Sequence, residues 1–106
     1  MADYLLWRGA VASLTDIYIH TEDNWGTAQA YKYISQLYQC FEQIAAQQIP
    51  WRPIPAEFEI SGYFTRSEKH FVYFKELADG AIGIVAVIHQ RRHQIARLRE
   101  AFSIAE

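Results

Sequence analysis

Apolar positions in the first half of the chain recur at intervals of three and four residues, and this spacing predicts two helices. The first spans Ala10 to Asn24, with Leu14 and Ile17 on its apolar face. The second carries a narrow apolar stripe made of Ala30, Ile34, Leu37, Phe41 and Ile44. Between them, Gly26 tolerates the conformation that closes a helix, and Thr27 offers a hydroxyl to cap the next one. A break of about three residues predicts an antiparallel helical hairpin.

The second half of the chain has the shorter and denser apolar runs that are typical of strands. The expected strands, counting one that precedes the first helix, are Asp3–Arg8, Gly62–Arg66, His70–Leu77 and Ala81–His89. The residues Ala78-Asp79-Gly80 are a turn signal for a hairpin between the last two strands. Apolar residues return at helical spacing over Gln94–Phe102, so a short C-terminal helix is expected there.

The segment Gln47–Pro55 separates the helical half from the strand half. It holds all three prolines of the chain, which lack a backbone donor and restrict the residues before them. We expect an ordered loop here, anchored by Trp51 and Ile54. The resulting order, β-α-α-β-β-β-α, predicts an α+β fold in a single domain over residues 1–106. The helical hairpin should pack on a mainly antiparallel sheet.

Composition favours a folded intracellular protein, and no cofactor is expected. Of the 106 residues, 51% are apolar and 21% are charged, which suits a chain with a core of its own. The lone Cys40 cannot form an internal disulfide, and no apolar run approaches the ~20 residues of a membrane helix. The N-terminal stretch MADYLLWRGA is not a secretion signal, so a cytoplasmic location is expected. His89 and His93 lie four apart without a third ligand nearby, so no metal site is expected.

Positive charge is concentrated at one point of the chain. The net charge is −2, yet residues 61–106 hold seven Lys/Arg and five Asp/Glu, against three and seven in residues 1–60. The apolar run Ile84–Ile88 is followed directly by a cluster of basic residues: His89, Arg91, Arg92, His93 and Arg97. These cations repel one another and precede a helix, where the helix dipole disfavours them. We therefore predict a target-binding site that phosphate or an acidic partner neutralises, with Arg66 and Lys69 as additional basic surface. A solvated basic edge is the alternative.

Aromatic residues form two further groups of candidates. Three tyrosines of the second helix, at positions 31, 33 and 38, form either an amphipathic binding ridge or the packing of the hairpin against the sheet. Three aromatic residues at positions 71, 73 and 74 lie in a strand, and core packing is favoured over a base-stacking surface.

The order of several short motifs resembles the ParE branch of the ParE/RelE toxin superfamily over nearly the whole chain. The matching residues are Ala10, Leu14, Asp16-Ile17, Thr21, Trp25-Gly26, Gln29-Ala30, Tyr33, Leu37, Phe41, Ile44-Ala45, Pro50, Gly62-Tyr63, His70 to Phe74, Val87-Ile88-His89-Gln90-Arg91 and Ala96-Arg97-Leu98. Four residues depart from the family pattern. Ser13 stands where an acid is frequent, Phe64 where a basic residue is frequent, and Arg92-His93 where Met-Asp is frequent.

The resemblance implies the toxin of a type II toxin–antitoxin module, which inhibits growth by binding and poisoning DNA gyrase. It also implies a cognate ParD-like antitoxin, and it allows for a higher-order toxin–antitoxin hetero-oligomer. The antitoxin is expected to cover the hairpin and the sheet through apolar anchors at Tyr31, Ile34, Tyr38 and Phe74.

Two alternatives stay open at this point. RelE-like relatives cut mRNA on the ribosome, and Arg66, Lys69, His89, Arg91 and His93 supply the residue types that such a nuclease needs. The strands carry few cations for that task, so binding without bond cleavage is preferred. The other alternative is a non-toxic member of the family that only binds a protein partner.

Overall fold

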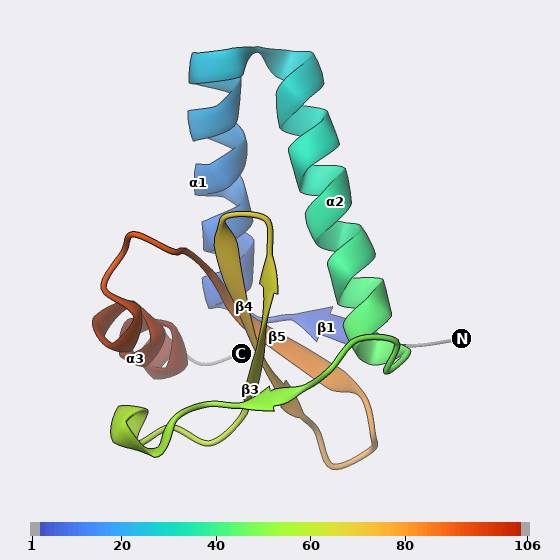
Figure 1. Cartoon of the computed structure of the whole chain (residues 1–106), viewed down its shortest axis with the longest axis vertical. Coiled ribbons are helices and arrows are strands. Elements are labelled where there is room, and N and C mark those ends of the chain that lie inside the picture. Colours follow the sequence, from blue (N-terminus) through green and yellow to red (C-terminus); the bar gives the residue numbers. More distant parts are fainter. Residues whose placement is uncertain (1–2, 105–106) are drawn as a thin grey trace.

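The computed structural model describes residues 3–104. The elements in chain order are β1 (Tyr4–Leu6), α1 (Arg8–Trp25), α2 (Thr27–Ala45), β2 (Arg52–Pro53), the short 3-10 helix η1 (Ala56–Phe58), β3 (Tyr63–Ser67), β4 (His70–Glu76), β5 (Ile82–His89) and α3 (Gln94–Ile104). Figure 1 shows α1 and α2 as a long antiparallel hairpin that extends beyond one end of the sheet. The predicted α+β fold, with its N-terminal strand, helical hairpin, sheet and C-terminal helix, is confirmed.

The sheet has five strands in the order β1-β5-β4-β3-β2. β1 pairs in parallel with β5, and all other pairs are antiparallel. His70 and His89 lie opposite each other at one end of the β4–β5 pair. The register then shifts between Tyr73, which faces Ala86, and Phe74, which faces Ile84. Tyr73 and Phe74 lie on opposite faces of the sheet, and both are buried.

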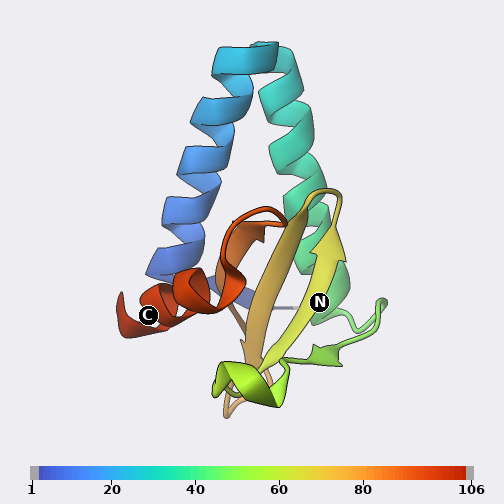
Figure 2. The ribbon, with the colours of Figure 1, turned by 60° about the vertical axis from the view of Figure 1, so that its left-hand side comes forward.

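Strand β5, which lies between β1 and β4, is buried on both faces, and this explains its unbroken apolar run. On one face, α1 and α2 enclose a core that includes Leu37, Phe41, Phe74 and Ile84. On the other face, α3 covers a second core that includes Val85 and Leu98, with the side chains around η1 packed at its margin. Figure 2 shows α3 crossing the sheet on the side away from the hairpin. Strands covered on both faces cannot alternate with polar residues without burying them.

The helix boundaries differ from the predicted ones at two places. α1 begins at Arg8 and not at Ala10, because the chain leaves β1 at Trp7, whose N–H donates to the carbonyl of Ile84 at 2.9 Å. The connection between the helices is the single residue Gly26, which has φ of +91°. A side chain disfavours that region, so glycine is suited to so abrupt a reversal. The predicted cap at Thr27 is wrong, since its hydroxyl donates to Glu22 across the turn at 3.1 Å.

The proline-rich segment is an ordered connection, as predicted, and it also contains a strand that the prediction missed. β2 is only two residues long and lies at the edge of the sheet, where proline is tolerated. Trp51 donates from its indole nitrogen to the carbonyl of Ile44 at 3.1 Å, and Ile54 is buried. The two predicted anchors therefore both pack against the body of the protein.

Within residues 3–104, every helix is too short or too polar to cross a lipid bilayer.

Candidate functional site

The predicted basic cluster forms a compact turn between β5 and α3, called here the basic turn (His89–His93). It lies at the end of the sheet over which the helical hairpin projects, beside the β3–β4 connection (Figures 1 and 2). The backbone N–H of Gln90 donates to the carbonyl of Lys69 at 2.8 Å, which joins the two connections directly. Arg66 at the end of β3 donates to the side-chain oxygen of Gln90 and to the carbonyl of Glu68. The structure therefore places Arg66 and Lys69 beside the basic turn.

Gln94, the first residue of α3, fixes the shape of the basic turn. Its amide nitrogen donates to the carbonyls of His89 at 2.8 Å and Arg92 at 3.0 Å. Its amide oxygen accepts from the buried hydroxyl of Tyr73 at 2.8 Å. A further backbone bond of 2.9 Å runs from the N–H of Arg92 to the carbonyl of His89. The exposed side chains of Arg91 and Arg92 therefore extend from a backbone that is held at several points.

Both histidines of the basic turn accept backbone hydrogen bonds. The N–H of Arg91 donates to Nδ1 of His89, and the N–H of Ala96 donates to Nδ1 of His93, both at 3.1 Å. His93 thereby caps the start of α3. In the neutral form of each ring, the proton then resides on Nε2, because Nδ1 is already an acceptor. Each ring can therefore donate a hydrogen bond, but it is poorly prepared to take up a proton as a general base.

A third histidine lies just behind the basic turn. His70, which is 8% exposed, hydrogen-bonds through Nδ1 with the hydroxyl of Tyr33 from α2. Its ring meets that of His89 edge to face, with 5.1 Å between the ring centroids. Burial, and then the charge of His89, lowers the pKa of His70 from 6.5 to about 4. His70 is therefore neutral at physiological pH and serves as a packed, hydrogen-bonded part of the core.

The pKa of His89 reflects its burial and the positive charge around the basic turn. Burial is the first cause that lowers its pKa, and positive neighbours lower it further: Arg91, Lys69, Arg92 and His20. Because these neighbours come from the basic turn itself, the β3–β4 connection and α1, the positive potential is a property of the assembled surface. Among the residues that the structure describes, no group of three His, Cys, Asp or Glu side chains is placed to hold a metal ion.

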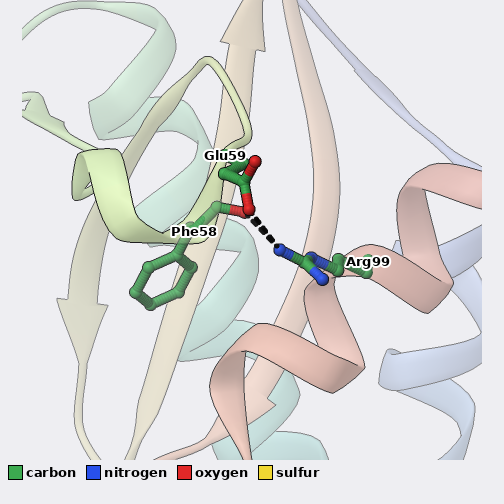
Figure 3. A network of polar contacts seen from close by, with 3 residues as sticks. All are labelled: Phe58, Glu59 and Arg99. Carbon is green, nitrogen blue, oxygen red and sulfur yellow. Dashed lines mark hydrogen bonds and ion pairs between the residues drawn. The ribbon is translucent and has the colours of Figure 1, made fainter.

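The two arginines of α3 have different surroundings. Arg99 donates to Glu59 at 3.3 Å and lies against the carbonyl of Phe58, which links α3 to the segment after η1 (Figure 3). This pair is exposed, so its contribution to stability is small. Arg97 is also exposed, one helical turn beyond the basic turn, and its N–H donates to the carbonyl of His93 at 3.1 Å. Of the two, Arg97 is the one that extends the basic surface.

The helical hairpin carries a second surface, which is apolar. A shallow groove of about 250 Å³ runs between α1 and α2 and is lined by Leu14, Thr15, Tyr18, Ile19 and Ile34. Tyr31, which is 64% exposed, packs edge to face on Tyr18 at 5.8 Å between ring centroids. Tyr38, which is 39% exposed, packs in the same way on Phe41. Tyr31, Ile34 and Tyr38 are three and four residues apart on α2, so they follow one face of the helix.

The predicted aromatic residues of β4 do not belong to that surface. Phe74 is fully buried beneath the hairpin, where it packs against Trp51 and Tyr63. It therefore cannot be an exposed antitoxin anchor, because a strand between two helical layers turns its side chains into the core. Tyr73 is likewise buried, and Phe71 is partly covered by the guanidinium of Arg66 at 5.9 Å from the ring centroid.

Sequence reasoning missed two side chains that shape the site. Gln94 was assigned only to the start of a helix, and no local pattern reveals that it bridges β4 and the basic turn. Ser13, noted as a departure from a family pattern, donates to the carbonyl of Gly9 at 2.8 Å and accepts from the N–H of Val87 at 3.3 Å. Ser13 therefore ties α1 to β5 inside the protein. Phe64, another such departure, packs against the second core.

Comparisons with known proteins match this architecture to one family. The family described as "ParE toxin of type II toxin-antitoxin system, parDE" matches residues 4–94, which include the hairpin, the sheet and the basic turn. Toxin ParE of Escherichia coli is 31% identical over 100 residues, which cover 94% of this chain and 96% of the relative. Toxin ParE1 of Caulobacter vibrioides is 33% identical over 99 residues, covering 92% of this chain and 99% of the relative.

A solved structure shows the same fold. It is described as the chromosomal ParDE TA system from P. aeruginosa, and one of its chains superposes with a TM-score of 0.68 at 22% identity. The match covers 84% of this chain and 96% of that chain. The two chains thus share a fold in which a helical hairpin packs on a sheet. The family match over most of the chain is decisive, and this protein belongs to the ParE toxins of type II toxin–antitoxin systems.

Proposed function

We propose that this toxin inhibits growth in the cytoplasm by binding and poisoning DNA gyrase, and that a ParD-like antitoxin neutralises it. Membership of the ParE family supports the toxin–antitoxin role. The geometry of the basic turn supports binding over bond cleavage. Both of its histidines accept a backbone N–H on Nδ1, so neither offers a free base for the 2′-hydroxyl of RNA.

The contact with the target is assigned to the basic turn. Arg91 and Arg92 are exposed on a backbone that Gln94 and the Lys69 carbonyl hold in place. A fixed backbone lowers the entropy that an arginine loses when it binds, and arginine is frequent among residues that dominate binding energy. Arg97 and Arg66 extend the same basic surface on either side.

The contact with the antitoxin is assigned to the apolar surface of the hairpin. Tyr31, Ile34 and Tyr38 are placed along α2 as an amphipathic segment would need them, and the groove toward α1 adds apolar area. Helix-in-groove recognition uses anchors at this spacing. The two surfaces are chemically distinct, since one is basic and the other apolar. An antitoxin that binds the hairpin can therefore inhibit either by covering the basic turn as well or by excluding the target.

The experiment that tests the target compares two reactions of the purified toxin. We expect inhibition of gyrase-driven supercoiling of a relaxed plasmid and no cleavage of mRNA on translating ribosomes. The R91A/R92A double variant should lose the inhibition, whereas a K32A/R52A variant, which removes two exposed cations elsewhere, should keep it. Codon-positioned mRNA cleavage that disappears in H89A would contradict the proposal and support the RelE-type nuclease. Normal growth at verified soluble expression would support the non-toxic binder.

A further inference from the structure

The cations around the basic turn have no acidic partner within residues 3–104. In that part of the chain, the salt bridge formed is Arg99–Glu59, which links α3 to the segment after η1 and does not involve the basic turn. Arg66 is bound by neutral oxygens of Gln90 and Glu68, and Lys69 is exposed at the adjoining connection. With Arg91 and Arg92, four permanent positive charges adjoin where the two connections meet, against the single exposed carboxylate of Glu68, which forms no salt bridge among the described residues. Repulsion between these charges destabilises the folded protein, and a bound anionic ligand would reduce that repulsion.

The donors at this point are ordered as well as charged. The side-chain oxygen of Gln90, in the basic turn, accepts a hydrogen bond from the guanidinium of Arg66, which extends from β3. The amide of Gln94 bonds to the backbone carbonyl of Arg92. The N–H of Arg91 bonds to Nδ1 of His89, which leaves the proton of the neutral ring on Nε2 as a donor. Burial and the neighbouring charges lower the pKa of His89, so this neutral donor form prevails at physiological pH. The site thus combines one neutral N–H donor with several guanidinium and ammonium groups.

The aromatic residues near the site decide which anionic polymer fits. Recognition of single-stranded RNA relies on exposed aromatic rings on which unpaired bases stack. Here Tyr73 is buried, and the ring of Phe71 lies beneath the guanidinium of Arg66. The described residues around the basic turn therefore offer donors for phosphates but no free aromatic platform for bases. A duplex, which exposes its phosphates and hides its bases, matches that set.

We infer that the basic turn, together with Arg66 and Lys69, binds the phosphodiester backbone of duplex DNA directly and without sequence specificity. The inference rests on the same surface as the proposed function but does not need gyrase. Because the whole chain has a net charge of −2, the attraction is local and opposed by the rest of the molecule. Binding of the free toxin is therefore weak and strongly dependent on salt. On a gyrase–DNA complex, these contacts with DNA would add to the contacts that the toxin makes with gyrase.

The test measures the fluorescence anisotropy of a short labelled DNA duplex titrated with the purified toxin at several salt concentrations. We expect a Kd of about 10⁻⁴–10⁻⁶ M at physiological salt, as for non-specific DNA binding, and tighter binding at low salt. The slope of log Kd against log salt should fall by about 2 in R91A/R92A, because each arginine neutralises one phosphate and each phosphate contributes about one unit. R91K/R92K should keep most of the slope, since the charges remain. K32A/R52A has the same net charge as the alanine double variant and should bind like the parent.

Several results would overturn the inference. One is an unchanged anisotropy at low salt for the folded toxin. Another is an equal decrease of the slope in K32A/R52A, which would show that only net charge matters. A polyglutamate peptide that competes as well as duplex DNA of the same charge would indicate an acidic protein partner, and tighter binding of single-stranded RNA would indicate an RNA site. The supercoiling assay is read separately, so DNA binding without gyrase inhibition would reject the proposed function and leave this inference standing.

Discussion

The hydroxyl of Tyr73 in β4 donates a hydrogen bond of 2.8 Å to the side-chain oxygen of Gln94 at the start of α3. The bond crosses from the sheet to the connection that carries the cluster of positive charge. Burial raises the pKa of Tyr73 to about 12, so the hydroxyl remains a donor throughout the neutral range. The amide nitrogen of Gln94 then donates two hydrogen bonds to carbonyls of the basic turn. Tyr73 and Gln94 together determine where Arg91 and Arg92 are presented.

We predict that removal of the link between Tyr73 and Gln94 lowers the free energy of unfolding and loosens the basic turn. Tyr73→Phe deletes one buried hydrogen bond and should lower the free energy of unfolding by about 1 kcal/mol, measured by urea denaturation. Gln94→Ala deletes three bonds and leaves the hydroxyl of Tyr73 without its partner, so the decrease should be larger, about 2–3 kcal/mol. Gln94→Ala should also raise the hydrogen exchange rate of the basic turn, whereas Gln39→Ala on the exposed side of α2 should change neither. Equal exchange rates in Gln94→Ala and the parent would show that the turn holds its shape without the amide.

Substitution of Arg91 and Arg92 should reduce toxicity without reducing stability. Both side chains are exposed, and surface substitutions of this kind change stability by about 0.5 kcal/mol or less. Truncation of an arginine that anchors a binding interface can cost about 2 kcal/mol or more, so R91A/R92A should lose growth arrest at an unchanged melting temperature. The readouts are the thermal midpoint and the growth of induced cells, with K32A/R52A as the matched control. Full toxicity of R91A/R92A would make the basic turn a solvated edge, and loss of toxicity through unfolding would make these residues structural.

His70 makes stability dependent on pH in the acidic range. Its pKa is about 4 in the folded protein and 6.5 as the ordinary value, so the unfolded chain binds a proton first as the pH falls. The stabilisation is complete above pH 6.5 and is lost as the pH falls toward 4, by about 3 kcal/mol in total. The groups that face His70 are Tyr33 from α2 and His89 from β5.

The measurement is urea unfolding at a series of pH values between these two pKa values. His70→Gln keeps a polar group for Tyr33 and should flatten the dependence, even if it lowers stability overall. Retention of the full slope in His70→Gln would assign the effect to another group.

Gly83 is required by the close approach of Trp7. A Cβ atom at position 83 would lie 2.6 Å from Nε1 and 3.1 Å from Cε2 of the indole. The ring is buried among packed side chains, so it has little room to move away. Overpacking of this kind costs about 1–3 kcal/mol, and we expect that decrease in the free energy of unfolding for Gly83→Ala in chemical denaturation. The double variant Trp7→Phe/Gly83→Ala should be less destabilised than the sum of the single variants, and strict additivity would show that the two residues do not compete for space.

The antitoxin should depend on the tyrosines of α2. Tyr31→Ala and Tyr38→Ala each remove an exposed aromatic anchor, and each should raise the Kd of the toxin–antitoxin complex at least about tenfold, or about 1.4 kcal/mol. Lys32→Ala and Gln39→Ala, at neighbouring exposed positions, should have much smaller effects. Calorimetry at two salt concentrations should show only a modest change in Kd, because apolar contacts are not screened. A complex that dissociates at moderate salt would assign the affinity to the basic turn.

Periodicity alone determined most of the architecture. The stripe from Ala30 to Ile44 indicated a helix packed on a core, and the run Ile84–Ile88 indicated a strand covered on both sides. Proline and glycine located the breaks, since both act through backbone geometry that is encoded locally. The boundaries were less well determined, as at Trp7, because helix ends depend on which carbonyl of a distant strand is free to bond. The density of cations after β5 was likewise visible in the sequence, because the charge of an arginine or lysine follows from the residue type alone.

Only the tertiary structure decided what those side chains contact. Phe74 and Tyr73 are adjacent in the sequence, yet they belong to two different cores on opposite faces of the sheet, and neither remains on a surface. Gln94 gained its importance from Tyr73, which is 21 residues away. The histidines of the basic turn are poor general bases because backbone N–H groups occupy Nδ1 of each ring. Hydrogen bonds and packing between segments far apart in sequence depend on the complete arrangement of strands, whereas period and charge are properties of the chain itself.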